Sequence, residues 1–398
     1  MKIALFTPLN PVRSGIADYS EEMLLELKRH VDIDLYIDPG YSPSNQRIVD
    51  EFTIHPFDAS RFDPSAYDEI VYHLGNSHSA HGYAYDALKR FPGIVVLHDY
   101  VFQGFYAEML QASRDPKRYL DLLRRVYPGQ GDRLARLISE RLPYPIWESE
   151  LALEFPLNEE IIGLAKGLIV HSDFVRRRVR SKYTLPVVTI PHHGHVLKPY
   201  GREQARKELG FSASDIVVCS TGYVTKNKRY QSIIPALSEL AEPRLKYIIV
   251  GRDEANFLKV LCQDSRLTVV RKGFATLEEL EKCLVAADIG INLRYPTMGE
   301  NSGSLLRMMS YKKPVLVSDA GSYREFPDHS LIKISGDVDE QVMIKRFVQE
   351  LIKDKEFRLS LGREAGRYAA TECGIARCSR EYIRFIHQLA KKNQPRRK

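Results

Sequence analysis

Short apolar runs alternate along the first half of the chain with longer segments of helical period. Strand-length apolar runs that are bounded by turn residues and separated by helical segments are typical of a parallel sheet with helices on its faces. The first half is therefore predicted to form a doubly wound α/β domain. Its predicted strands are residues 3–7, 33–37, 69–72, 93–98 and 167–171.

Helices are predicted where apolar residues recur every three or four positions, because that spacing places them on one face. Residues 104–165 are helical in pattern and rich in Arg, Leu and Tyr, and their length predicts an inserted pair or trio of helices. Ser172 precedes a helix predicted over 173–182 and is a favourable N-cap for it. The stripe that follows the first strand consists of Ile16, Tyr19, Met23 and Leu27.

A second series of the same kind follows the segment Thr-Ile-Pro-His-His-Gly at residues 189–194, which interrupts the pattern and marks a predicted domain boundary. Helices predicted within the series include 277–287 and 305–311, and a last helix is predicted over 377–391. The predicted strands are residues 216–220, 246–250, 267–270, 289–293 and 315–318. The apolar positions of the last helix are Tyr382, Phe385, Ile386 and Leu389.

The length supports two domains, because 398 residues exceed the roughly 250–300 at which a single hydrophobic core stops growing. We predict an N-terminal domain over residues 1–194, a C-terminal domain over 195–376, and a final helix with a basic tail over 377–398. Open α/β sheets bind ligands beyond the carboxyl ends of their strands. A cleft between the two domains is therefore the expected place for a site.

The amino-acid composition limits the class of protein but does not indicate a particular ligand. Lys and Arg (58) exceed Asp and Glu (51), and the net charge of +7 suits an anionic ligand, a nucleic acid or an acidic membrane surface. Five cysteines without CxxC spacing argue against a disulfide framework or a zinc site. The histidines His192, His193 and His195 lie at the predicted domain junction and are expected to have no partner carboxylate, so no metal site is predicted.

No targeting or membrane segment is predicted. The start of the chain turns polar and proline-rich at once, and no run approaches the ~18 apolar residues of a spanning helix. A cytoplasmic protein is expected, with peripheral attachment to the inner face of the membrane as an alternative. The basic residues that would carry such attachment, or simply form a solvated face, are Arg124, Arg125, Arg133, Arg176, Arg177 and Arg178.

Two loops after predicted strands contain residue types suited to phosphate. Gly222 is followed by Lys226, Lys228 and Arg229, and cations beside a glycine at the carboxyl end of a strand suit a diphosphate. A solvated basic loop is the alternative. In the other loop, Gly15 permits close approach of a ligand, and the helix that begins there presents backbone N–H groups to an anion. A plain strand-to-helix turn explains this glycine equally well.

A third segment joins the strand predicted at 289–293 to the next helix. Its Ser302, Gly303 and Ser304 offer backbone and hydroxyl donors at a helix N-terminus, where anions bind. Glu300 is an acceptor for hydroxyl groups, or alternatively a carboxylate favoured by the helix dipole. A sugar attached to a phosphate fits this combination.

Polar residues also follow strand ends in the first domain. His98 ends a predicted strand, and at that place it can donate a hydrogen bond to a ligand hydroxyl or serve as a structural histidine. The residues predicted on the acceptor side of the site are Arg13, Asn76, His78, His81 and Asp99.

Taken together, these segments resemble the family-4 retaining glycosyltransferases, a part of the group 1 glycosyltransferases. That family has the GT-B fold, in which two Rossmann-like α/β domains face a cleft. The resemblance covers nearly the whole chain and implies a helical insertion in the N-terminal domain and a C-terminal helix that packs on that domain. Its landmarks are residues 14–15, 96–99, 171–177, 190–194, 222–228, 250–251, 273–280 and 299–318.

The resemblance implies transfer of a hexose from a nucleotide diphosphate sugar, with UDP-glucose expected first, to an acceptor hydroxyl with retention of configuration. It implies no metal, no bound cofactor and no nucleic acid partner. The expected acceptor is a saccharide or lipid-linked saccharide in polysaccharide or glycoconjugate biosynthesis, or else a small metabolite. The implied catalytic residues are His98, Lys228 and Glu300. The implied ligands of the donor diphosphate and sugar are Gly15, Gly222, Lys226, Arg229, Asn301, Ser302, Gly303, Ser304 and Leu305, and those of the nucleoside are Arg271, Phe274 and Arg307.

Two positions depart from the family pattern. Tyr223 stands where an Arg usually follows the glycine, and Lys226, Arg229 or Arg294 would have to replace that cation. Arg307 stands where a second Glu usually binds ribose, so ribose recognition must differ. Glu300 itself lies one residue out of register. A nucleotide-sugar epimerase and a non-catalytic nucleotide-sugar-binding protein are the alternative functions.

Overall fold

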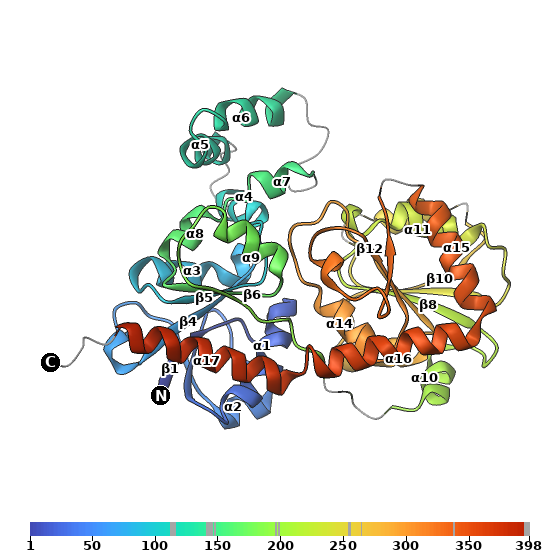
Figure 1. The fold of residues 1–398 in the computed structure, drawn as a ribbon, viewed down its shortest axis with the longest axis horizontal. Coiled ribbons are helices and arrows are strands. Elements are labelled where there is room, and N and C mark those ends of the chain that lie inside the picture. Colours follow the sequence, from blue (N-terminus) through green and yellow to red (C-terminus); the bar gives the residue numbers. More distant parts are fainter. Residues whose placement is uncertain are drawn as a thin grey trace. The chain divides into compact units, whose positions relative to one another are not determined.

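The computed structural model describes residues 1–111, 117–140, 146, 149–195, 197, 200–253, 256–263, 265–336 and 339–393. The chain forms two compact units (Figure 1). The first contains Met1–His193, Met298–Asn301 and the C-terminal segment from Ile375; the second contains Gly194–Thr297 and Ser302–Gly374. Each unit is a parallel sheet with flanking helices, which confirms the predicted α/β class.

The sheet of the first unit has seven parallel strands among the described residues, in the order β3-β2-β1-β4-β5-β6-β7. The short edge strands β3 and β7 are not apparent from the sequence, because neither contains a continuous buried apolar run. The bounds are β1 (Lys2–Phe6), β2 (Asp32–Ile37), β3 (Thr53–Pro56), β4 (Glu69–Leu74), β5 (Ile94–Leu97), β6 (Gly167–Val170) and β7 (Val187–Thr189).

The helical insertion lies between β5 and β6, as predicted, but it contains more helices than the expected pair or trio. In the described residues these are α4 (Gln103–Gln111), α5 (Lys117–Val126), α6 (Gly131–Glu140), α7 (Leu151–Glu154) and α8 (Glu159–Leu164). Gly129, with a φ of 78°, lies in the turn between α5 and α6. The other helices of this unit are α1 (Gly15–Leu27), α2 (Gln46–Glu51), α3 (His78–Arg90), α9 (Asp173–Arg180) and α17 (Ile375–Asn393).

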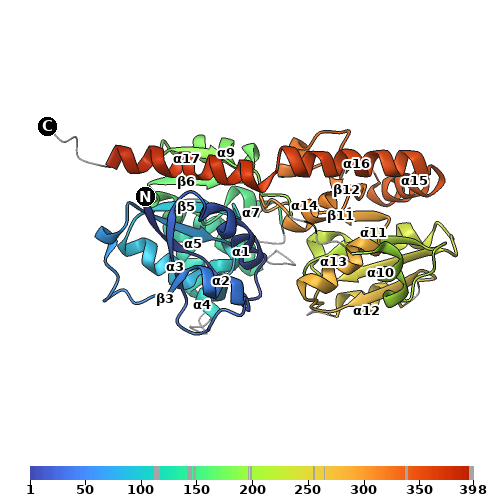
Figure 2. The ribbon, with the colours of Figure 1, turned by 90° about the horizontal axis from the view of Figure 1, so that it is seen from below.

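Successive side chains of the first sheet point to opposite faces and enter two separate cores. One core is formed with residues of α3, α8 and α9. The other contains Tyr19 of α1 and Tyr382 of α17, and these two helices pack together on that face (Figures 1 and 2). The four apolar positions predicted for the last helix are all buried. Their strand partners in this core include Val71, Ile94, Val96 and Ile169.

The second unit has six parallel strands among its described residues, in the order β10-β9-β8-β11-β12-β13. They are β8 (Ile216–Thr221), β9 (Leu245–Val250), β10 (Thr268–Lys272), β11 (Ile289–Asn292), β12 (Val315–Ser318) and β13 (Ile332–Ile334). The helices are α10 (Arg202–Leu209), α11 (Tyr230–Ser238), α12 (Phe257–Leu261), α13 (Leu277–Ala286), α14 (Gly303–Ser310), α15 (Glu340–Lys353) and α16 (Lys355–Thr371).

Both strand orders reverse direction once, between β1 and β4 in the first sheet and between β8 and β11 in the second. At such a point the loops that leave neighbouring strands turn to opposite faces, which leaves a crevice at the carboxyl edge. The loops after β8 and β11 are therefore the first place to look for a ligand site in the second unit.

No helix in the described ranges has both the length and the apolar content to cross a lipid bilayer.

Candidate functional site

The loop after β8 folds its lysine back onto the strand end. The Nζ atom of Lys228 donates to the backbone oxygen of Thr221 at 2.8 Å, and the residue is 7% exposed. Gly222, with a φ of 89°, makes this possible, because a Cβ atom there would lie 2.5 Å from Nζ. The glycine and the lysine of this motif are thus coupled by direct packing.

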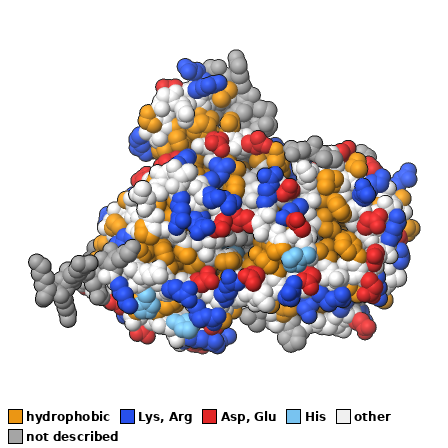
Figure 3. Space-filling model, in the orientation of Figure 1, with side chains coloured by type: hydrophobic (Ala, Val, Ile, Leu, Met, Phe, Trp, Pro, Cys, Tyr) orange, Lys and Arg blue, Asp and Glu red, His pale blue; other side chains and the backbone are white. Residues whose placement is uncertain are grey.

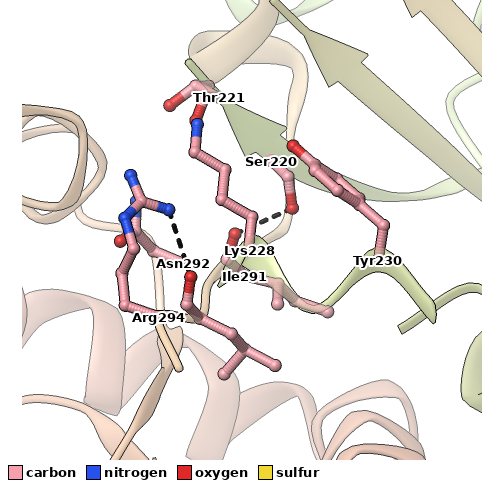
Figure 4. A pocket seen from close by; sticks show the side chains of 8 residues that line it. Ser220, Thr221, Lys228, Tyr230, Ile291, Asn292 and Arg294 are labelled. Carbon is pink, nitrogen blue, oxygen red and sulfur yellow. Dashed lines mark hydrogen bonds between the residues drawn. The ribbon is translucent and has the colours of Figure 1, made fainter. Parts of the chain in front are cut away.

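A small pocket lies at the reversal point of the second sheet (Figure 4). The ammonium group of Lys228 and the guanidinium group of Arg294 point to the same side of it (Figure 4). The Nη1 atom of Arg294 donates to the oxygen of Leu293 at 3.1 Å, which holds the side chain close to the end of β11. The lining residues are Ser220, Thr221, Lys228, Tyr230, Ile291, Asn292, Leu293 and Arg294.

Arg294 rather than Arg229 is therefore the second cation of this pocket. The Nε atom of Arg229 donates to both carboxylate oxygens of Glu340 on α15, at 2.9 and 3.2 Å, so that its charge is balanced there. Lys226 is exposed in the same loop. The sequence offers Arg294 as one of three possible substitutes for the missing cation, because spacing alone does not show which of the three side chains lines the pocket.

The N-terminus of α14 is connected to the same pocket. Ser302 is the N-cap, and its hydroxyl accepts from the N–H of Leu305 at 3.2 Å. Asn292 of the pocket donates from Nδ2 to the hydroxyl of Ser304 at 3.0 Å. The first-turn N–H groups of a helix have no acceptors within the helix, and the positive end of its dipole favours an anion. The helix begins at Gly303, two residues before its predicted start.

The segment Met298–Asn301 is part of the first unit. Asn301 donates from Nδ2 to the oxygen of His171 at 2.8 Å, and Glu300 accepts at Oε2 from the N–H of Met298 at 2.6 Å. Glu300 precedes the N-cap of α14 by two residues, so it is not a first-turn carboxylate. One of its oxygen atoms is already used by its own loop.

The residues expected near a nucleoside differ in their surroundings. Phe274 is 57% exposed after β10, and Arg271 is also exposed. Arg307, in contrast, is buried and forms an ion pair at 3.5 Å with the carboxylate of Glu281 from α13, which is buried too. The positive charge of Arg307 therefore has a negative partner, which the sequence did not reveal.

At the reversal point of the first sheet, Gly15 is exposed at the start of α1. Nothing lies within 4 Å of the position that a Cβ atom would take there. The hydroxyl of Ser14 caps the helix by accepting from the N–H of Ile16 at 3.2 Å. Arg13 before it is exposed. The fold itself leaves open space at this glycine.

The predicted acceptor-side residues after β4 make local structural bonds. Asn76 accepts at Oδ1 from the N–H of Phe105 at 2.8 Å and so caps α4, while the ring of His78 packs on Phe105. His81 is buried and donates from Nδ1 to the backbone oxygen of His73 at 3.0 Å. These bonds give all three residues a role in the fold.

Asp99 is the acidic residue of this group. Its Oδ2 atom accepts from the N–H of Asn76 at 2.8 Å. Burial raises its pKa to about 6, against the effect of that N–H, which favours the charged form, and the charge of Glu300 adds to the rise. A carboxyl group with such a pKa changes its charge close to neutral pH.

His98 is embedded among other histidines. Its Nε2 atom lies 3.2 Å from Nδ1 of His73, and its Nδ1 atom lies 3.2 Å from Nε2 of His171. Burial and the neighbouring imidazoles lower its pKa well below the ordinary value, so the ring is neutral at pH 7. Both ring nitrogens are thus engaged within the first unit, and a bond from His98 to a ligand hydroxyl requires one of these bonds to open.

The histidine cluster includes residues that sequence reasoning missed. His73 in β4 and Tyr382 in α17 belong to it. His73 could have been predicted from the alternation of side chains along the strands, since His73, His98 and His171 all fall on one face of the sheet. The expectation that His193 has no carboxylate beside it is wrong, because Glu22 of α1 lies 2.9 Å from its Nε2 atom.

The proposed basic surface is mixed in charge. On the face drawn in Figure 3, Lys and Arg side chains are interspersed with Asp and Glu. Arg124 pairs with Asp121 and Asp132, and Arg176 pairs with Asp173. Such pairing reduces the attraction of these arginines for an anionic surface.

Comparison with known proteins gives a family match for part of the chain. A model of the family described as glycosyl transferases group 1 matches residues 201–368. No curated protein sequence matches the chain.

Several solved structures are similar over nearly the full length. One is Anabaena Alr3699/HepE in complex with UDP-glucose, at 16% identity over 98% of this chain and 100% of that chain, with a TM-score of 0.64. Another is sucrose-phosphate synthase from Thermosynechococcus elongatus, at 15% identity over 99% and 100%, with a TM-score of 0.66. A third is WaaG, a glycosyltransferase involved in lipopolysaccharide biosynthesis, at 14% identity over 96% and 99%, with a TM-score of 0.62.

At these identities the structural similarity establishes the fold, and it confirms the GT-B architecture that the sequence motifs indicate. The family match covers most of the second unit, including Lys228, Arg294 and the start of α14. We conclude that the chain has the GT-B fold and that its residues 201–368 match the group 1 glycosyl transferases, which supports a glycosyltransferase.

Proposed function

We propose that the protein transfers a hexose from a nucleotide diphosphate sugar to a hydroxyl group of a saccharide or lipid-linked saccharide. The observation that carries the donor class is the juxtaposition of Lys228 and Arg294 at the reversal point of the second sheet. The first turn of α14 is hydrogen-bonded to the same pocket through Asn292. Two cations and a helix N-terminus suit the charges of a diphosphate.

UDP-glucose is the first donor to test, because the similar HepE structure contains UDP-glucose. The proposed acceptor class is supported by the similarity to WaaG, a glycosyltransferase involved in lipopolysaccharide biosynthesis. An enzyme of this kind would act in polysaccharide or glycoconjugate biosynthesis in the cytoplasm or at the inner face of the membrane.

In the proposed reaction the protein acts mainly by stabilising the leaving group, which is the nucleoside diphosphate. As the bond between the anomeric carbon and the diphosphate oxygen breaks, negative charge grows on the diphosphate. Lys228, Arg294 and the first-turn N–H groups of α14 would stabilise this charge because they are already oriented. Their advantage over water is that they need no reorganisation during the reaction.

Retention of configuration would follow from attack on the face that the diphosphate leaves. The acceptor oxygen forms the new bond to the anomeric carbon, and its proton passes to the departing phosphate oxygen. This route needs neither a protein nucleophile nor a metal ion. Closure of the site around the donor would limit its hydrolysis.

The other residues predicted from the sequence are proposed to contact the donor sugar, the base, a phosphate or the acceptor. Glu300 and Asn301 would contact the donor sugar, and the exposed ring of Phe274 would stack on the base. Gly15 would admit a phosphate close to the start of α1. Of the acceptor-side residues, Asp99 is the strongest, because its carboxylate lies at a strand end and changes its charge near neutral pH.

The decisive experiment incubates the purified protein with UDP-glucose, other nucleotide-glucose donors and a panel of saccharide acceptors, with and without a chelator. Release of nucleotide coupled to an α-linked product, unchanged by the chelator, is expected. Conversion of the donor to an epimer without an acceptor would establish an epimerase instead. A rise in melting temperature with nucleotide but no turnover would indicate a binding protein.

A further inference from the structure

Four side chains of the first unit form a continuous hydrogen-bonded chain across one face of its sheet. The hydroxyl of Tyr382 on α17 lies 2.8 Å from Nε2 of His73 in β4. From His73 the chain continues to His98 after β5 and to His171 after β6, with nitrogen–nitrogen distances of 3.2 Å at both steps. It ends at the backbone oxygen of Ile190, 2.9 Å from Nδ1 of His171.

The carbonyl group at the end fixes the direction of the whole chain. A carbonyl oxygen can only accept, so Nδ1 of His171 carries the hydrogen atom. A neutral imidazole has one N–H group, which leaves Nε2 of His171 as an acceptor and makes Nδ1 of His98 the donor to it. The same reasoning makes Nε2 of His98 an acceptor from Nδ1 of His73.

The hydroxyl of Tyr382 must then donate to Nε2 of His73, because that atom has only a lone pair. A side branch agrees with this direction. The Oγ atom of Ser20 lies 3.2 Å from Nδ1 of His73 and 2.6 Å from the hydroxyl of Thr7, whose Oγ1 atom donates to the oxygen of Pro8 at 3.4 Å. The single N–H group at Nδ1 of His73 is therefore shared between Nε2 of His98 and Oγ of Ser20, and the second branch ends at the oxygen of Pro8.

Reversal of the chain is unfavourable in this environment. If His98 carried its hydrogen atom on Nε2, then His171 would have to donate from Nε2 and would present a bare Nδ1 to the oxygen of Ile190, or would need an additional proton. Tyr382, His73 and His98 are between 0 and 8% exposed, and His171 is 4% exposed. An additional charge in such surroundings is costly.

We propose that these four residues form a positioning relay, through which α17 fixes the tautomer and ring orientation of His98, and that sugar transfer depends on it. The inference rests on the proposed function, for which the family resemblance implies His98 as a catalytic residue. In the fixed tautomer Nε2 of His98 offers only a lone pair, so a ligand hydroxyl that reaches this atom donates to it, in competition with His73. This reverses the donor role expected for His98 from its sequence position.

The first test reads the tautomers directly. Nitrogen NMR of the full-length protein labelled with ¹⁵N-histidine, assigned by single His→Asn substitutions, should show the three relay histidines as Nδ1–H forms at pH 7. An Nε2–H form or a mixture at His98 would overturn the relay. In Tyr382→Phe the resonances of His73 and His98 should both shift, although Tyr382 contacts only the former.

The second test uses kinetics with a matched control. Tyr382→Phe should lower kcat about tenfold or more, on the scale of losing alignment of a reacting group, and leave KM for the donor within about twofold. Tyr72→Phe removes another fully buried hydroxyl of the same unit, one that donates to the oxygen of Phe91 at 2.6 Å, and should leave kcat within about twofold. Equal kcat losses in the two variants would refute a positioning role.

A double substitution separates positioning from general stability. If Tyr382 acts through His98, Tyr382→Phe should cause no further loss of kcat in a His98→Ala background. An undiminished further loss would refute action through His98. If the wild-type protein transfers no sugar from any donor, the proposed function fails, while the NMR experiment still decides whether the relay exists.

Discussion

Replacement of Lys228 tests the proposed diphosphate site most directly. Lys228→Met keeps the buried aliphatic stem but removes the ammonium group, which is 2.8 Å from the oxygen of Thr221. At 4 Å and an effective dielectric constant of about 20, the attraction between Nζ and one phosphate charge is worth about 4 kcal/mol. That corresponds to a loss of about 100- to 1000-fold in kcat, which is also the typical effect of removing one charge-stabilising group.

The fold should survive this substitution. The oxygen of Thr221 loses a donor at a cost of about 1–3 kcal/mol, and the buried charge disappears at the same time. A urea titration and single-turnover kinetics on the same preparation separate the two effects. Lys246→Met is the matched control, because Lys246 also donates to a backbone oxygen, that of Pro243 at 3.1 Å, but lies near the amino end of β9.

A folded Lys228→Met protein with kcat within about threefold of wild type would refute the assignment of the donor diphosphate to Lys228. Loss of activity in Lys246→Met as well would indicate a general effect of surface charge instead.

Three further predictions follow from local geometry. Gly15→Ala should leave the free energy of unfolding unchanged or raise it by up to ~1 kcal/mol, since a Cβ atom meets nothing there and Ala favours a helix. The same substitution should raise KM for the donor about tenfold. An unchanged KM would show that Gly15 is not part of the donor site. Gly222→Ala should lower the free energy of unfolding by about 1–2 kcal/mol, because Gly222 has a φ of 89°, and should displace the side chain of Lys228. Gly273→Ala is the control, because there is open space around Gly273. Equal melting temperatures of the two variants would contradict the packing argument. Burial, with added repulsion from neighbouring imidazoles, lowers the pKa of His73 to about 3, and burial lowers that of His171 to about 4, whereas the unfolded chain binds these protons near pH 6.5. The free energy of unfolding should therefore fall as the pH drops from about 6.5 toward 4, by up to ~1.4 kcal/mol per pH unit for each histidine, and urea titrations that give a flat profile over this range would contradict the neutral relay.

The central strands were predictable because each combines a continuous apolar run with turn residues at its ends. The edge strands β3 and β7 were not, since most of their side chains are not fully buried and they are held by pairing with a neighbour. The strand β13 has two buried isoleucines, but its three residues are too few to show a strand pattern. The number of helices between β5 and β6 was underestimated for a related reason. Local turns such as that at Gly129 divide a region whose apolar period continues on both sides.

The pocket was predictable in part. The position of Lys228 followed from its place after a strand, because the carboxyl edge of a parallel sheet is fixed by chain direction. The choice between Arg229 and Arg294 did not follow, because it depends on Glu340, a residue more than a hundred positions later that balances the charge of Arg229. Pairing of charges is a property of neighbours in space.

Local periodicity and chain direction are enough to predict the alternation of strands and helices, the burial of one face of α17 and the placing of glycines and cations at strand ends. The pairing of charges, as between Arg307 and Glu281, and the alignment of three histidines from separate strands with Tyr382 depend on contacts between distant parts of the chain. The direction of that hydrogen-bonded chain depends on one carbonyl group, and no local pattern in the sequence records which carbonyl that is.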